Sequence, residues 1–389
     1  MHRLAYIILL FASLTLTCTA QDSDALHPVP QLRQLRSDST LTRGEKLRES
    51  RNIFIRFIKA FDEYDTTYIE PNLYNWTVML QGTTTNESFS LTDRQGLSRL
   101  AFGSRPGMKI GPYLGWRFIF LGYTIDVTTI GRQKSSKTEF ELSLYSSMLG
   151  ADLFYRRTGT DFNLRRAIGF EQGNGQPLDL FPHYGQQMDG IRVSITGANV
   201  YYIANHRQFS LPAAFSQSTV QRRSAGSWKF GLSVTRHNIN VDYQRLEDQM
   251  PELQGCNPFQ TAKMDYMDYS LSAGYAYNWV FHRNWLFSID LAPALGYKRT
   301  HRSLWLDDPT VSLTPTTSEL MHRFFVSRGN VNFNVTGRLG LVWNNAHHYA
   351  GLSLIAHNFN YRYNDLSMHN SFFTLNLYTG INFMRKKGK

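Results

Sequence analysis

Strict alternation of apolar with small or polar residues runs through residues 268–297, and it constrains the fold of this 389-residue chain more than any other feature. The stretch reads DYSLSAGYAYNWVFHRNWLFSIDLAPALGY. Successive side chains of a β-strand point to opposite faces of its sheet, so this period of two predicts two long strands joined by a turn at His282, Arg283 and Asn284. The same alternation continues from about Tyr68 almost to the end of the chain.

The face opposite the apolar one separates a soluble sandwich from a membrane barrel. A soluble sandwich usually carries many Lys, Glu and Arg side chains on its outer face, whereas an enclosed lumen suits small and neutral polar residues. In the last strands the second face reads Asn330, Asn332, Asn334, Thr336, Arg338 and Gly340, then Thr374, Asn376, Tyr378, Gly380 and Asn382. The pattern therefore predicts an all-β fold, a transmembrane antiparallel β-barrel of about 10–14 strands.

Connections between the expected strands alternate between short and long. Short turns fall at residues 282–284 and 344–347, while long polar segments fall at residues 244–265 and 298–328. This asymmetry is typical of outer-membrane barrels, which have tight periplasmic turns and longer external loops. Aromatic residues beside the short turns are predicted to form a structural girdle at the inner membrane interface. They are Trp279, Phe281, Trp285 and Trp343.

Five residues on the second face are predicted to line the lumen. They are Asp290, Asn332, Asn334, Arg338 and Asn376. Asp290 and Arg338 carry opposite charges, so we expect them either to pair with each other or with neighbours, or to set the charge preference of a pore.

The N-terminal segments predict export. Residues 1–20 combine a basic start, an apolar run and a small-residue exit, the pattern of a signal peptide. Residues 21–43 are a polar linker, residues 44–64 an amphipathic periplasmic helix, residues 65–384 the outer-membrane barrel, and residues 385–389 a basic tail. After signal removal Cys256 is the remaining cysteine, so no intramolecular disulfide is expected. The formal charge of +11 falls to +10 after signal removal, because Arg3 is the only charged Lys, Arg, Asp or Glu in residues 1–20. In an exported chain this charge favours anionic lipid headgroups or a sugar-acid surface over nucleic acid as a partner.

Several segments together resemble a known family, the domain of unknown function 4421 group of exported proteins from Gram-negative bacteria. The resemblance spans about residues 61–383. It implies an outer-membrane, barrel-like architecture without an assigned activity, so no catalytic residue can be transferred. The segments that carry it are YDTTYIEPNLYNWTVMLQG, KIGPYLGWRFIFLGYTID, LGADLFYRR, QRRSAGSW and GYAYNWVFHRNWLF.

No catalytic, cofactor or metal motif stands out, and the sequence favours a role other than that of an enzyme. Our leading interpretation is a monomeric outer-membrane barrel for passive transport, such as a porin, or for envelope binding. Its expected partners are outer-membrane lipid, lipopolysaccharide and the barrel-assembly machinery, with no nucleic acid. One alternative is a lipid-modifying hydrolase at the outer rim, for which His369 and Ser371 could share a strand face. The other alternative is a soluble exported β-sandwich.

Overall fold

The protein is built almost entirely of β-strands. The computed structural model describes residues 64–93, 98–116, 119–122, 125–127, 138–158, 162–171, 178, 180–253, 262–303, 331–363 and 366–386. The expected signal peptide, linker and amphipathic helix lie outside the described residues, apart from Tyr64, and so does the end of the basic tail. None of the helices in the described ranges combines the length and the apolar character that a membrane crossing requires.

The strands and helices of the described part follow the chain in this order: β1 (Ile69–Pro71), β2 (Tyr74–Asp93), β3 (Arg99–Ser104), β4 (Gly107–Trp116), β5 (Ile119–Gly122), β6 (Ile125–Asp126), β7 (Thr138–Tyr145), β8 (Leu149–Thr158), β9 (Phe162–Ile168), the 3-10 helix η3 (Phe181–His183), β10 (Gln187–Met188), β11 (Ile191–Ile203), α4 (Pro212–Phe215), β12 (Thr219–Gln221), β13 (Ala225–Val241), α5 (Tyr243–Gln249), η4 (Pro251–Leu253), β14 (Ala262–His282), β15 (Trp285–Ser303), β16 (Val331–Asn344), β17 (His348–Tyr363) and β18 (Leu366–Arg385).

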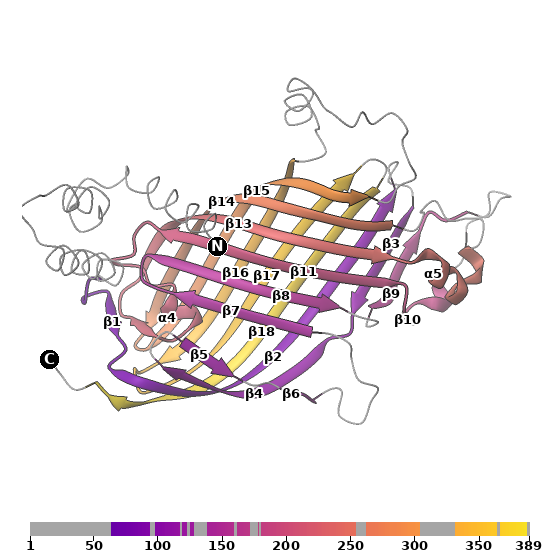
Figure 1. The fold of residues 1–389 in the computed structure, drawn as a ribbon. Helices are drawn as coiled ribbons and strands as arrows, with labels where there is room; N and C mark the ends of the chain where they lie inside the picture. Colours follow the sequence, from indigo (N-terminus) through magenta and orange to yellow (C-terminus); the bar gives the residue numbers. More distant parts are fainter. Residues whose placement is uncertain are drawn as a thin grey trace, which may run out of the picture.

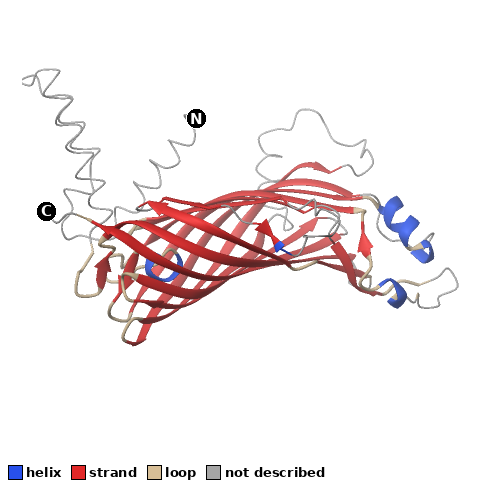
Figure 2. Ribbon diagram, turned by 90° about the horizontal axis from the view of Figure 1, so that it is seen from below, coloured by secondary structure: helices blue, strands red, loops and turns tan. Residues whose placement is uncertain are grey.

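One antiparallel sheet of 16 strands forms the body of the molecule and curls around an elongated interior (Figures 1 and 2). Strands β13 to β18 pair in chain order, and β18 then pairs with β2, so the last strand joins the first long one. Ten strands, namely β2, β4, β8, β11 and β13 to β18, have at least 10 residues. The predicted fold class, an all-β antiparallel barrel with about ten to fourteen strands, is confirmed by this curled sheet.

The two ends of the curled sheet differ in their connections. One end, which we call the turn end, holds the tight turns at residues 283–284 and 345–347, the start of β2 and the end of β18. The opposite end, the loop end, carries α5, η3 and β10 (Figure 1). At the loop end, β9 and β10 also join the sheet, where β9 pairs with β3 and with β10.

The two faces of the sheet exchange their chemical character partway along the strands. On the outer face of β13, Trp228 and Phe230 are exposed near the turn end, whereas Arg236 is the exposed side chain further along. On the inner face, buried Lys229 gives way to buried Ile239 in the same direction. The half near the turn end is thus apolar outside and polar inside, and the half near the loop end is the reverse.

Neighbouring strands share this reversal, so the turn-end half has a continuous apolar outer surface. We call this surface the apolar belt, and its exposed side chains include Val78, Leu80, Leu114, Leu153, Trp228, Phe230, Leu271, Leu291, Phe333, Leu352 and Leu377. A contiguous apolar surface of this extent is unusual for a protein surrounded by water.

The loop-end half is filled by an apolar core that lies inside the curl. Phe89 and Leu91 of β2, Phe102 of β3, Phe162 of β9 and Ile191 of β11 are all fully buried in it. Because these side chains come from both margins of the curled sheet, they close the interior at this end, and β9, β10 and α5 complete the cover (Figure 1).

The interior at the turn end is filled by a segment that folds back into it. Residues 204–224 connect β11 to β13 and include α4; we call them the plug. Figure 2 shows this short helix inside the curl. Ala213 and Ala214 pack against Leu286 of β15 and Val342 of β16. Asn278 Nδ2 donates to the carbonyl oxygen of Ser210 at 2.7 Å.

Candidate functional site: a charged cavity inside the curled sheet

Between the plug and the loop-end core lies a cavity of about 310 Å³. Its wall is supplied by β2, β4, β7, β8, β11 and β16 to β18, and by the plug. Gln217 of the plug bounds it toward the turn end, and Phe372, a member of the loop-end core, bounds it on the other side. The cavity therefore sits at the level of the apolar belt, where the inner face of the sheet is polar.

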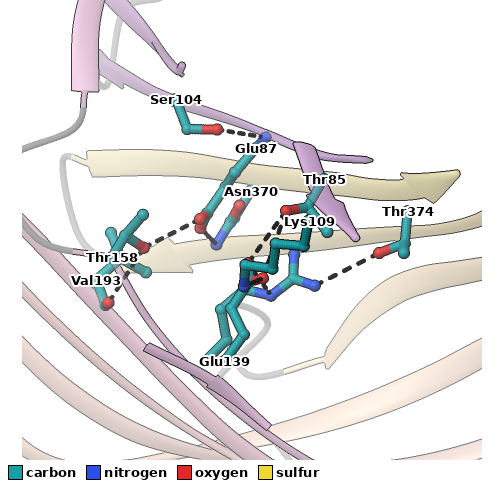
Figure 3. A network of polar contacts seen from close by, with 10 residues as sticks. Thr85, Glu87, Ser104, Lys109, Glu139, Thr158, Val193, Asn370 and Thr374 are labelled. Atoms are coloured by element: carbon teal, nitrogen blue, oxygen red, sulfur yellow. Dashed lines mark hydrogen bonds and ion pairs between the residues drawn. The ribbon is translucent and has the colours of Figure 1, made fainter. Parts of the chain in front are cut away.

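Glu139 of β7 organises a first ion-pair cluster at this cavity. Lys109 Nζ of β4 donates to Glu139 Oε2 at 2.6 Å, and Arg156 Nε of β8 lies 3.6 Å from Glu139 Oε1 (Figure 3). Thr85 of β2 donates to the same carboxylate at 3.3 Å. Strands from both margins of the curled sheet therefore meet at one carboxylate, since β7 ends the strand order and β4 branches from β2.

Arg156 is 8% exposed, and its guanidinium is only partly satisfied. The group lies 4.2 Å from the centre of the Phe372 ring, and Nη2 reaches Thr374 Oγ1 at 3.5 Å. Its other terminal nitrogen, Nη1, is buried without a hydrogen-bond partner. A buried charged donor without an acceptor is costly, because water has been removed and nothing replaces it.

A second cluster joins distant strands across the interior. Arg338 of β16 donates from Nη2 to Asp152 Oδ2 of β8 at 2.7 Å, and Arg338 Nε lies 3.8 Å from Asp290 Oδ2 of β15. Asp290 also pairs with Lys229 of β13. Asn199 of β11 donates to Asp152 at 3.3 Å. The four charged side chains of this cluster are each at most 6% exposed, so their charges are compensated by one another rather than by water.

Nearer the loop end, two further buried carboxylates have their own partners. Asp268 of β14 lies 3.6 Å from Lys298 Nζ and accepts from Asn334 Nδ2 at 2.8 Å. Glu87 of β2 accepts from Thr158 of β8 at 3.0 Å and from Asn370 of β18 at 3.3 Å (Figure 3).

The five residues expected to line a lumen lie as follows. Asp290, Arg338 and Asn334 are buried in the clusters above. Asn376 lines the cavity and accepts a hydrogen bond from Thr83 Oγ1 at 2.8 Å. Asn332 is half-buried, and its Nδ2 atom has no hydrogen-bond partner.

The four aromatic residues of the expected girdle gather on the outer face beside the turn at residues 283–284. Trp279, Phe281 and Trp285 are exposed. The Trp279 and Phe281 rings lie 5.5 Å apart between centroids, and Phe281 and Trp285 lie 6.1 Å apart. Trp343 is the register partner of Trp285 on the neighbouring strand.

Five charged members of the clusters were not singled out from the sequence. They are Lys109, Glu139, Asp152, Arg156 and Lys229. Lys229 had a readable signal, because a lysine between Trp228 and Phe230 in an alternating strand must lie on the face opposite to an apolar one. Glu139 had a similar signal, because Phe140, Leu142 and Leu144 alternate with polar residues in β7. Lys109, Asp152 and Arg156 stand in strands whose alternation is less regular.

The candidate hydrolase residues lie on β18 near the loop end. His369 is exposed and Ser371 half-buried on the outer face. Asn358 Nδ2 of β17 lies 3.5 Å from His369 Nε2 and 3.3 Å from Ser371 Oγ, so an amide stands between the imidazole and the hydroxyl. In the described ranges, no three His, Cys, Asp or Glu side chains gather closely enough to hold a metal ion.

A curled antiparallel sheet with a charged interior and an apolar belt defines the class of this protein, the β-barrels. The chain belongs to the family described as Domain of unknown function (DUF4421), whose model matches residues 63–383. No curated protein matches the chain.

Solved structures of outer-membrane proteins align with the chain. The outer membrane protease OmpT from Escherichia coli aligns at 7% identity, covering 81% of this chain and 98% of its own, with a TM-score of 0.35. OprG from Pseudomonas aeruginosa aligns at 8% identity over 80% and 97%, with a TM-score of 0.22. The toluene transporter TodX from Pseudomonas putida aligns at 8% identity over 80% and 91%, with a TM-score of 0.19.

Proposed function

We propose that this protein is a non-conducting barrel of the outer membrane that binds an envelope component in its interior. The observation that carries the proposal is the double closure of the interior. The apolar core fills the loop end, the plug fills the turn end, and the charged cavity lies between them. A diffusion pore needs a continuous water-filled path from end to end, whereas a cavity closed toward both ends suits a bound molecule.

The apolar belt supports the membrane location. The outward faces of outer-membrane barrels carry an apolar band about 25 Å tall with aromatic girdles. The exposed cluster of Trp279, Phe281 and Trp285 at the turn end has the character of such a girdle. The turn end then faces the periplasm, and lipid and lipopolysaccharide are the neighbours of the belt. The signal-like residues 1–20 are consistent with export.

Single-channel recording in a planar bilayer tests the closure. The protein is first refolded and checked for a gel mobility that shifts on heating, and an open porin recorded in the same bilayer serves as the positive control. We expect insertion without conductance steps. Stable, reproducible steps from the wild-type protein would show a continuous path and refute the proposal.

A further inference from the structure

The cavity borders a margin of the curled sheet where the strands do not pair with each other. In the described part of the chain, β7 pairs with β8 alone, and β4 pairs with β2, β5 and β6. Side chains join the two margins instead, through the contact of Lys109 with Glu139. The short strands β5 and β6 pair with the edge of β4 that faces β7 (Figure 1). Among the described residues, an ion pair rather than a backbone ladder therefore links β7 to this side of the sheet.

At this border the cavity is lined by the ion pair of Lys109 and Glu139, and further charged residues lie deeper in the interior. Arg156 and Arg338 lie deep in the interior, and both are more than nine-tenths buried. Phe140 of β7 also lines the cavity, yet 58% of its surface is exposed on the outer face of the sheet. The cavity thus reaches from the buried guanidinium groups to the side of the barrel at the level of the apolar belt.

The charges next to the cavity are grouped in two clusters that contain more cations than carboxylates. The cations are Lys109, Arg156, Lys229 and Arg338, and the carboxylates are Glu139, Asp152 and Asp290. The carboxylate of Glu87 and the pair of Asp268 with Lys298 lie nearer the loop end, and with them the described buried charges of the interior balance. Buried charges are usually paired, because removing an ion from water costs several kcal/mol. An anion in the cavity would supply an acceptor for Arg156 Nη1.

Arg156 is the residue of the cavity wall that is placed to contact a bound anion. Its Nη1 atom is buried, lacks a hydrogen-bond partner and belongs to a residue that lines the cavity. A guanidinium presents donors in a planar fork that fits carboxylate and phosphate oxygens. The cavity volume of about 310 Å³ corresponds to roughly ten water molecules at about 30 Å³ each, enough for such a group and the first part of a chain.

From these observations we propose that the cavity binds the anionic group, a carboxylate or a phosphate, of a membrane amphiphile that reaches it through the border between β4 and β7. Arg156 donates to the anionic oxygens, with Lys109 beside it. The hydrocarbon chain passes Phe140 toward the apolar belt. This inference rests on the proposed function in that it takes the interior to be closed at both ends, so that the ligand arrives from the side.

Titration calorimetry on the refolded full chain in neutral maltoside micelles tests the site, with protein-free micelles as the blank. The probes are decanoate, decanol, acetate and inorganic phosphate. We expect saturable binding of decanoate and none of decanol, which has the same chain without the charge. Acetate and phosphate, which lack a chain, should bind at least about tenfold more weakly than decanoate.

Matched variants locate the contact. R156Q should weaken decanoate binding at least about tenfold, the usual effect of losing a hydrogen bond to a charged group. R157Q, which changes the neighbouring exposed arginine on the outer face of β8, should bind as the wild type does. E139Q removes the carboxylate that competes for Arg156 and Lys109, so it should bind decanoate more tightly. R156K keeps the charge and provides a second variant in case R156Q does not fold.

Each outcome is decisive. No decanoate binding by folded wild-type protein, or equal binding by wild type and R156Q, overturns the proposal. Binding of inorganic phosphate as tight as that of decanoate keeps the anion site and overturns access from the membrane. Failure of the inference is distinguishable from failure of the proposed function, because a chain that neither conducts nor binds decanoate retains the closed barrel, whereas conductance steps refute the closure itself.

Discussion

Arginine substitutions along the outer face of β13 should reveal where the lipid begins and ends. On this face, apolar side chains run from Trp228 to Val234, and Arg236 and Asn238 follow. Leu232 lies within the apolar run, and Asn238 lies six residues further toward the loop end. At about 3.3 Å per residue the two positions are about 20 Å apart along the strand, or about 14 Å in depth for a tilt of about 45°.

A charge at these two depths should have very different costs. Arginine near the middle of the lipid destabilises a barrel by about 2–4 kcal/mol, and by only about 0–1 kcal/mol near the interface. Leu232→Arg should therefore lower the free energy of unfolding by about 2–4 kcal/mol. Asn238→Arg should lower it by less than about 1 kcal/mol, since the new side chain lies beyond Val234 and opposite Asp265.

Equilibrium urea unfolding in phospholipid vesicles, followed by tryptophan fluorescence, gives both values. Leu232→Ala is the control that separates the loss of the leucine from the gain of the charge. Equal costs for Leu232→Arg and Asn238→Arg would refute the assignment of the lipid boundary to the point where the two faces of the sheet exchange character.

Three further predictions concern the interior and the loop end. Asp290→Ala should cost about 3–5 kcal/mol in urea unfolding, because it leaves Lys229 buried without its carboxylate. Phe102→Ala should cost about 3–5 kcal/mol in the same assay, since the ring is fully buried in the loop-end core. His183 gives a pH dependence: burial disfavours the charged ring, but hydrogen bonds with Gln186 and Glu252 outweigh it and raise the pKa of His183. The pKa of His183 is higher in the folded than in the unfolded protein, so protonation of this ring stabilises the fold. This stabilisation is complete below the ordinary histidine pKa of about 6.5 and is lost as the pH rises through the pKa of the folded state. NMR titration of the ring should show the raised pKa.

Controls for these predictions come from the same strands and loops. Asp265→Ala breaks the more exposed pair with Arg236 and should cost less than about 1 kcal/mol, in contrast to Asp290→Ala. Phe230→Ala removes a ring that is 44% exposed, so it should cost less than Phe102→Ala. Glu252→Gln should return the pKa of His183 toward its ordinary value. The arguments would be contradicted if the two aspartate variants lost similar amounts of unfolding free energy, or if the two phenylalanine variants did. An unchanged His183 titration in Glu252→Gln would contradict the argument for the raised pKa.

The curled sheet could be predicted from the sequence because its signal is local. A period of two over residues 268–297 requires only that neighbouring side chains point to opposite faces, and the register of β14 with β15 follows from the turn at residues 283–284. The same reasoning distinguishes the apolar face of β16 from the face that carries Asn334 and Arg338.

The sequence also contains a signal for the exchange of apolar and polar character between the two faces of the sheet, but the period of two alone did not predict it. In residues 225–241 the apolar side chains occupy the even positions Trp228, Phe230, Leu232 and Val234, and then the odd positions Ile239 and Val241. Four polar residues, 235–238, separate the two phases, and each phase by itself has the period of two, so a search for the period alone passes over the change. A reversal of the apolar phase within one strand marks the point where the burial of the two faces reverses.

The plug and the ion pairs could not be predicted because they depend on contacts between strands that are far apart in the chain. Arg338 meets Asp152 across 186 residues, and the curvature of the sheet decides which lumen side chains face each other. The plug lies at the turn end, where outer-membrane barrels have tight turns, so the general rule predicts a short connection. Its composition, with Phe209, Leu211 and Ala213 close together, was the one local sign that this connection is buried.

The buried charges around the cavity argue for a site there. The loop-end core and the plug bury apolar side chains together. The cavity between them instead keeps two charged clusters and the unpartnered Nη1 of Arg156 in a space that an apolar side chain could fill. A chain that needed only stability would gain from replacing these charges with well-packed apolar residues. Departures from local consistency that the rest of a fold has to stabilise are expected at binding sites, and here a buried guanidinium that lacks an acceptor contacts Glu139 at the border between β4 and β7.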